Sequence, residues 1–110
     1  DEALSPQGGQ FRRWMVHGTS HHLGLDVHDC AQARAEHYRL GELRPGMVIT
    51  VEPGIYFKST DLMVPPQLRG IGVRIEDDIV ITPNGYEILS SHLPRDSHEV
   101  ESWMSTIAPR

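Results

Sequence analysis

Two apolar, β-branched runs in the middle of the chain give the clearest pattern. Residues 47–51, MVITV, follow a turn at residues 43–46 and predict a strand. Residues 71–82, IGVRIEDDIVIT, predict a longer second strand. The tight turn Pro83-Asn84-Gly85 then leads into residues 86–89, which predict a short partner strand. The middle of the chain is therefore expected to form an antiparallel sheet.

The alternation along the first strand gives it one polar face. Thr50 and Glu52 share that face, opposite Ile49 and Val51. Pro53-Gly54 is expected to end the ladder, which places Glu52 at a strand end. At a strand end the fold can present a polar side chain without burying it in the core.

The second strand is also two-faced. Gly72, Arg74 and Glu76 point one way, whereas the apolar residues between them, from Ile71 to Ile75, point the other way. Because glycine has no side chain, Gly72 is expected to leave space where another group approaches the backbone.

The flanking segments carry weaker signals. Residues 1–10 predict a polar lead-in loop, because Ser-Pro and Gly-Gly interrupt regular structure. Residues 11–17 predict the start of a strand, and residues 24–28 a strand edge. Residues 29–42 and 57–69 are expected to be exposed loops, the latter made rigid by Pro65-Pro66.

The tail, residues 96–108, predicts a helix and makes the fold class α+β. Asp96 and Glu99 fit a capping box at its start. One apolar stripe follows at helical spacing, formed by Val100, Trp103, Met104 and Ile107.

Composition narrows the class of protein. A chain of 110 residues is at most one domain, and its net charge of −5, without a basic run, argues against a nucleic-acid partner. No apolar run is long enough to span a membrane. The single cysteine, Cys30, excludes an internal disulfide and favours a reducing compartment, so we expect a cytoplasmic protein. Cys30 is interpreted as a small apolar filler.

The histidines are candidates for metal binding and proton transfer. Four of the seven lie within twelve residues, and His21 together with Glu52 and Glu76 offers nitrogen and carboxylate ligands suited to divalent Zn, Mn, Co or Fe. Each has a simpler interpretation: a structural histidine, a turn residue and a solvated acidic patch. His17 and His28 are candidates for proton transfer or for supporting the site, or are structural. Arg74 can orient Glu76, or form a weak surface ion pair.

Three motifs in this order resemble one known family. HGTSHHLGLDVHD, TVEPGIY and GIGVRIEDDIVIT are similar to the C-terminal half of the catalytic domain of Xaa-Pro aminopeptidase (aminopeptidase P), a pita-bread metallopeptidase. The resemblance runs from about Phe11 to the tail helix. It implies a curved antiparallel sheet, two divalent ions, usually manganese, and peptide substrates with proline in second position. It also implies a homo-oligomeric parent.

The resemblance also implies residue roles. His21 corresponds to a terminal metal ligand, Glu52 to a ligand that also handles the proton, and Glu76 to a bridging ligand. His17 corresponds to a histidine lining the substrate pocket, and His28 to one that stabilises the tetrahedral intermediate or leaving amine. Arg74 matches the arginine beside the bridging glutamate, and a metal-bridging hydroxide is the implied nucleophile.

The family's ligand set is incomplete in this chain. Two aspartates and a further histidine are expected from the half that precedes it, and only Asp1 lies upstream of His17 as an aspartate. Three ligands are too few for two ions ~3.5–4 Å apart. We therefore expect a fragment, inactive without the N-terminal half of the same domain.

Three other interpretations stay open. Prolidase is a close relative that cleaves Xaa-Pro dipeptides and should reject longer peptides. A pita-bread module that has lost its metals would only bind peptides or proteins. A small metal-binding protein that folds alone would have to complete its coordination shell, and nothing in the chain does so.

Overall fold

The computed structural model describes residues 9–29 and 34–108. The elements in this part of the chain are, in order, the 3-10 helices η2 (Gln10–Arg13) and η3 (Ala35–His37), strands β1 (Val48–Val51) and β2 (Gly54–Tyr56), the 3-10 helix η4 (Pro66–Leu68), strands β3 (Gly72–Arg74), β4 (Asp77–Thr82) and β5 (Gly85–Ile88), and helix α1 (Ser97–Ile107). This confirms the α+β class, with antiparallel strands and a C-terminal helix.

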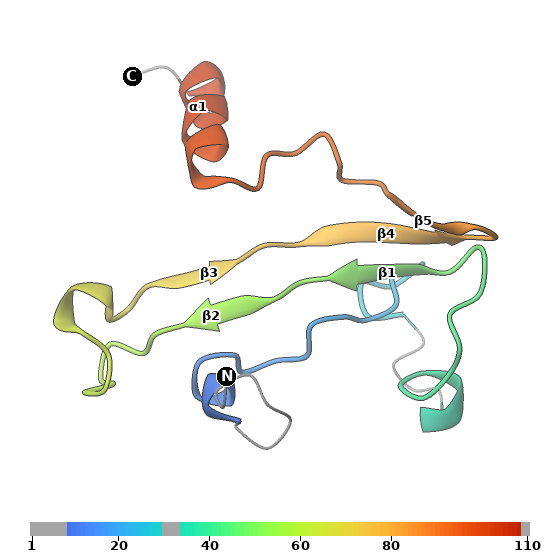
Figure 1. Cartoon of the computed structure of the whole chain (residues 1–110), viewed down its shortest axis with the longest axis horizontal. Helices are drawn as coiled ribbons and strands as arrows, with labels where there is room; N and C mark the ends of the chain where they lie inside the picture. The colour runs from blue at the N-terminus through green and yellow to red at the C-terminus, as the bar shows by residue number, and fades with distance from the viewer. Residues whose placement is uncertain (1–8, 30–33, 109–110) are drawn as a thin grey trace.

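One long two-stranded ribbon is the central element of the fold (Figure 1). β1 pairs with β4 at one end of it, and β2 pairs with β3 at the other, both antiparallel. β5 adds to the free edge of β4 through the two-residue turn that follows Thr82. The short partner strand was therefore predicted correctly, to within one residue.

The predicted strand 71–82 is wrong in one respect, because it is interrupted. The β1–β4 ladder ends at Val51 and Asp77, and the β2–β3 ladder starts at Gly54 and Arg74. The expectation that Pro53-Gly54 ends the pairing is also wrong, since β2 resumes at Gly54. Proline lacks an N–H group to donate to a ladder, which explains the gap on this strand.

The pairing keeps one register across this gap. Residue numbers of paired partners have the same sum on both sides, so Glu52 faces Glu76 and Pro53 faces Ile75. A single bond, from Ile75 N to the Pro53 carbonyl at 3.2 Å, crosses the gap. Two carboxylates therefore lie opposite each other where the ladder bonds are absent.

Other expectations need correction near the N-terminus. Residues 11–17 do not begin a strand, because Trp14 N and Met15 N both donate to the Phe11 carbonyl and close the turn of η2. Residues 24–28 form a bend and the start of a turn, and a bond from Asp29 N to the His22 carbonyl closes this excursion. Most of the predicted lead-in loop and the interpretation of Cys30 lie outside the described residues.

The helix prediction is confirmed. Asp96 is the N-cap, and its carboxylate accepts hydrogen bonds from His98 N and Glu99 N. Figure 1 shows α1 standing clear of the ribbon. Its stripe is accordingly open, with Trp103 45% and Ile107 61% exposed. Among the residues that the structure describes, no helix has the length and hydropathy that a bilayer crossing requires.

Burial in the described part of the chain is mostly polar. Among the described residues, Val64 is the buried hydrophobic side chain, whereas Thr50, Glu52 and Asp61 are buried polar residues. The ribbon face opposite Glu52 and Glu76 leaves its apolar residues open, namely Val51, Ile55, Val73 and Ile75.

Asp61 binds the loop after β2 to the N-terminal segment. Its two oxygens accept from Arg13 Nε and Nη2, both at 2.8 Å, and also from Trp14 Nε1 and Met63 N. The loop over residues 57–69 had been expected to be exposed. This expectation is only partly right, because Asp61 is buried. The hydrogen bonds from Arg13 hold the pKa of Asp61 well below its usual range.

We expect Asp61→Asn to destabilise the protein in a pH-dependent way. Because the pKa of Asp61 is lowered on folding, its contribution is fully present above the unfolded value of about 3.9 and is lost as the pH falls further. Urea unfolding should show a deficit for the variant at pH 7 that shrinks as the pH drops below about 4. Exposed Asp26→Asn is the matched control, and an equal deficit in both variants would contradict the assignment.

Candidate metal centre

His21 is carried by an irregular segment that adds to the edge of β1. Thr50 N donates to the His21 carbonyl at 2.9 Å, and Glu52 N donates to the Thr19 carbonyl at 2.7 Å. His22 forms an isolated antiparallel bridge with Ile49. The histidine segment and the strand that carries Glu52 are therefore held together by backbone bonds.

Thr50 connects the backbone of His21 to the side chain of Glu52. It is 1% exposed, and its hydroxyl accepts from His21 N at 3.1 Å and donates to Glu52 Oε1 at 3.3 Å. A buried polar group needs such partners, because leaving one unpaired costs about 1–3 kcal/mol. Thr50 thus fixes the relative position of His21 and Glu52.

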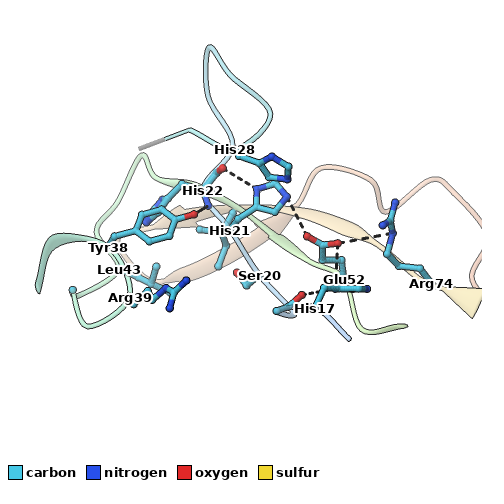
Figure 2. A pocket seen from close by; sticks show the side chains of 13 residues that line it. His17, Ser20, His21, His22, His28, Tyr38, Arg39, Leu43, Glu52 and Arg74 are labelled. Carbon is cyan, nitrogen blue, oxygen red and sulfur yellow. Dashed lines mark hydrogen bonds and ion pairs between the residues drawn. The ribbon is translucent and has the colours of Figure 1, made fainter. Parts of the chain in front are cut away.

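The orientation of the His21 ring follows from its two nitrogens. Nδ1 donates to the His22 carbonyl at 2.9 Å, which turns Nε2 toward Glu52 Oε1 at 3.1 Å (Figure 2). The ring also packs edge-on against His28, with centroids 4.5 Å apart. A histidine held by a carbonyl at one nitrogen is typical of a metal ligand that coordinates through the other.

The two opposed carboxylates have one cation between them in the described structure. Arg74 Nε lies 3.3 Å from Glu76 Oε2 and 3.9 Å from Glu52 Oε2. Like charges directly opposite each other in a sheet are destabilising, and Arg74, with its side chain 50% exposed, balances only one of the two. With His17 and His21 neutral, the site therefore retains a negative charge that favours a further cation.

His21, Glu52 and Glu76 fit a divalent metal ion. One ligand atom from each lies within 4.8 Å of the others. Metal–ligand bonds of ~2.1 Å at right angles separate two donor atoms by ~3 Å, close to the 3.1 Å between His21 Nε2 and Glu52 Oε1. A nitrogen and two carboxylates suit Mn²⁺, Co²⁺, Fe²⁺ or Zn²⁺.

His17 lies beside this group and is held by Tyr56. Its Nδ1 is 2.6 Å from the Gly18 carbonyl and donates to it, so Nε2 accepts from the Tyr56 hydroxyl at 2.7 Å. Gly54 and Gly72 make room for the tyrosine, because a Cβ at either position would approach its ring or hydroxyl to within 2.6–2.8 Å. The predicted close approach at Gly72 is thereby confirmed.

These side chains line one open cleft of ≈ 900 Å³. Figure 2 shows the imidazoles of His21 and His28 near the Glu52 carboxylate, with Arg74 on its far side. The other lining residues are His17, Gly18, Ser20, His22, Tyr38, Arg39, Gly41, Leu43 and Ile49.

The structure brings the predicted site residues into one neighbourhood. His21, Glu52 and Glu76 form the cluster, Arg74 contacts both glutamates, and His28, although exposed, packs on His21.

Three residues that support the site were not predicted from the sequence. Thr50 was placed on the face of Glu52 without a role, and alternation along the strand was the signal that pointed to it. Tyr56 follows Glu52 by four residues and so shares that face. Tyr38 had no signal, because its ring contacts His22 only through the fold, at a centroid distance of 5.0 Å.

The chain is similar to proteins of one known family. The family model described as metallopeptidase family M24 matches residues 2–83. Xaa-Pro aminopeptidase 1 of Streptomyces coelicolor is 62% identical over 99 residues, which cover 90% of this chain and 20% of that protein. The Xaa-Pro aminopeptidase of Escherichia coli is 50% identical over 93 residues, 84% of this chain and 20% of that protein.

Solved structures agree. Aminopeptidase P from E. coli with the inhibitor Pro-Leu superposes with a TM-score of 0.75 at 46% identity, covering 91% of this chain and 22% of that one. Aminopeptidase PepP of Pseudomonas aeruginosa gives a TM-score of 0.77 at 40% identity, over 91% of this chain and 22% of that one. This chain spans about a fifth of the length of these relatives.

Thr50→Val is expected to destabilise the protein by about 1–3 kcal/mol, because it removes the acceptor of His21 N and the donor to Glu52 from a buried site. Chemical denaturation measures this difference. Thr50→Ser keeps the hydroxyl and loses only a methyl group, so a valine variant as stable as the serine variant would contradict the bridging role.

Proposed function

This chain belongs to metallopeptidase family M24, and we propose that it forms the C-terminal portion of the catalytic domain of an Xaa-Pro aminopeptidase. The enzyme would release the N-terminal residue from peptides with proline in second position. The observation that carries the proposal is the convergence of one ligand atom each from His21, Glu52 and Glu76 within 4.8 Å, with His21 and Glu52 lining the cleft.

The metal chemistry is the first part of the proposal. His21, Glu52 and Glu76 would help to hold two divalent ions, with manganese the first candidate. The ions supply an activated water and polarise the scissile carbonyl when bound. Three donors do not complete two coordination shells, so the remaining ligands would come from another part of the same domain.

The surrounding side chains have separate proposed tasks. Glu52, buried against Thr50, would accept the proton that the attacking water releases. His28 is exposed to the cleft and would donate to the developing oxyanion or the leaving amine. His17, oriented by Tyr56, would line the substrate pocket. Arg74 would hold the two glutamates opposite each other.

The uncovered apolar face supports a need for further chain. Val51, Ile55, Val73 and Ile75 are 39–59% exposed on the side away from the cleft. We propose that the N-terminal half of the domain completes both the packing and the ligand set, and that this chain alone is inactive. A homo-oligomeric parent and a cytoplasmic location belong to the same proposal, the latter carried by the lone cysteine.

Substrate cleavage tests the function directly. The full-length enzyme, loaded with Mn²⁺, is expected to release the first residue of an Xaa-Pro-Xaa tripeptide. His21→Ala should lower kcat/KM by on the order of 100-fold or more. Substituting a residue that only hydrogen-bonds to a metal ligand already costs about 10- to 100-fold in activity or metal affinity. His92→Ala, at an exposed histidine outside the cleft, is the matched control. Product release is followed by chromatography.

Three results would contradict the proposal, each in a different way. Cleavage of Xaa-Pro dipeptides but not tripeptides would identify a prolidase. Peptide binding without cleavage or bound metal would identify a metal-free binding module. Equal activity of the His21→Ala and His92→Ala variants would remove His21 from the site.

A further inference from the structure

The segment that follows the sheet is bound to the strand beside Glu76. Arg95 donates from Nε to Asp77 Oδ2 at 2.7 Å and from Nη2 to Oδ1 at 2.5 Å. Ser90 Oγ donates to Asp77 Oδ1 at 2.6 Å and accepts from Asp78 N at 3.1 Å. We call Asp77, Ser90 and Arg95 the tail clamp.

The tail clamp lies at the point where the strand pairing stops. Asp77 pairs with Val51 in the last step of the β1–β4 ladder, and the next residues on the two strands are Glu76 and Glu52. These two glutamates lie in the gap between the two ladders. Neither is part of a paired step, so strand pairing does not directly fix their position relative to each other. Their positions therefore depend on the pairs at either end of the gap.

We propose that the tail clamp is a positioning device for the metal ligand Glu76, an inference that rests on the proposed function. Asp77 has its side chain only 18% exposed and is flanked by Glu76 and Asp78. Without Arg95 this carboxylate would be repelled by both neighbours and would lose two of its three side-chain hydrogen bonds, keeping only the one from Ser90 Oγ. The start of β4 would then loosen, and Glu76 would leave its place opposite Glu52.

Alternation separates this role from that of Arg74. Asp77 points to the face of β4 opposite Glu76. Arg95 therefore pairs with Asp77 on that face, whereas Arg74, which lines the cleft, pairs with Glu76. The tail clamp therefore reaches the metal ligands through the backbone of β4 and not through a shared contact.

The tail clamp also lies partly beyond the family match. The M24 model covers residues 2–83, whereas Ser90 and Arg95 come from the segment that follows. The tail thus contributes to a site whose motifs all precede it in the chain.

The sign of the effect on metal affinity distinguishes positioning from charge. Loss of Arg95 makes the site more negative, so electrostatics alone would tighten Mn²⁺ binding. Loss of positioning would weaken it. We expect Arg95→Gln to raise the Kd for Mn²⁺ about tenfold, at the low end of the effect of groups that orient metal ligands. Isothermal titration of the metal-free, full-length protein with Mn²⁺ measures the Kd.

Two further variants make the test specific. Ser90→Ala removes one donor and should weaken Mn²⁺ binding in the same direction but by less. Arg44→Gln, at an exposed arginine in the turn before β1, is the charge-matched control and should bind at least as tightly as the unsubstituted enzyme. Circular dichroism at the titration temperature confirms that each variant is folded.

The outcomes separate this inference from the function it rests on. If the unsubstituted enzyme binds Mn²⁺ and Arg95→Gln matches Arg44→Gln or binds more tightly, only the tail clamp's role is overturned. If the unsubstituted enzyme binds no Mn²⁺, the proposed function and this inference both fail.

Discussion

The repulsion between two carboxylates placed opposite each other governs this structure. Glu52 and Glu76 face each other where the ladder is open, and Glu52 is 8% exposed. A sheet with like charges opposed in this way needs cations to be stable. Arg74 supplies one cation. His21 is oriented so that its Nε2 could bind a second cation together with Glu52. The repulsion therefore costs stability locally, and a divalent ion bound at the proposed site would offset it.

The elements around this pair hold it in place by backbone bonds and buried side chains. The histidine segment adds to the edge of β1, Thr50 joins His21 to Glu52, and the tail clamp anchors β4 at its first residue. Loops that are positioned by a rigid ribbon in this way are suited to carry chemistry. The apolar face behind the ribbon is uncovered in the described structure, which supports the proposal that it packs against another part of the domain.

The sequence was informative where local chemistry decides the structure. Alternation correctly placed Glu52 and Glu76 on polar faces, and Asp96 marked the start of α1. Sequence reasoning failed where distant contacts decide. Residues 11–17 were predicted to begin a strand, but the chain turns in η2, beside the bond between Arg13 and Asp61. The gap in the strand 71–82 was missed because its cause lies at Pro53, on the opposite strand. Tyr56 could be assigned to His17 only once the register was known.

Anomalous diffraction from crystals of the Mn²⁺-loaded full-length enzyme, recorded at the manganese edge, tests the central claim most directly. Our account predicts anomalous peaks ~2.0–2.3 Å from His21 Nε2 and from carboxylate oxygens of Glu52 and Glu76. Manganese bound elsewhere, with these three side chains joined only by hydrogen bonds and by Arg74, would contradict it.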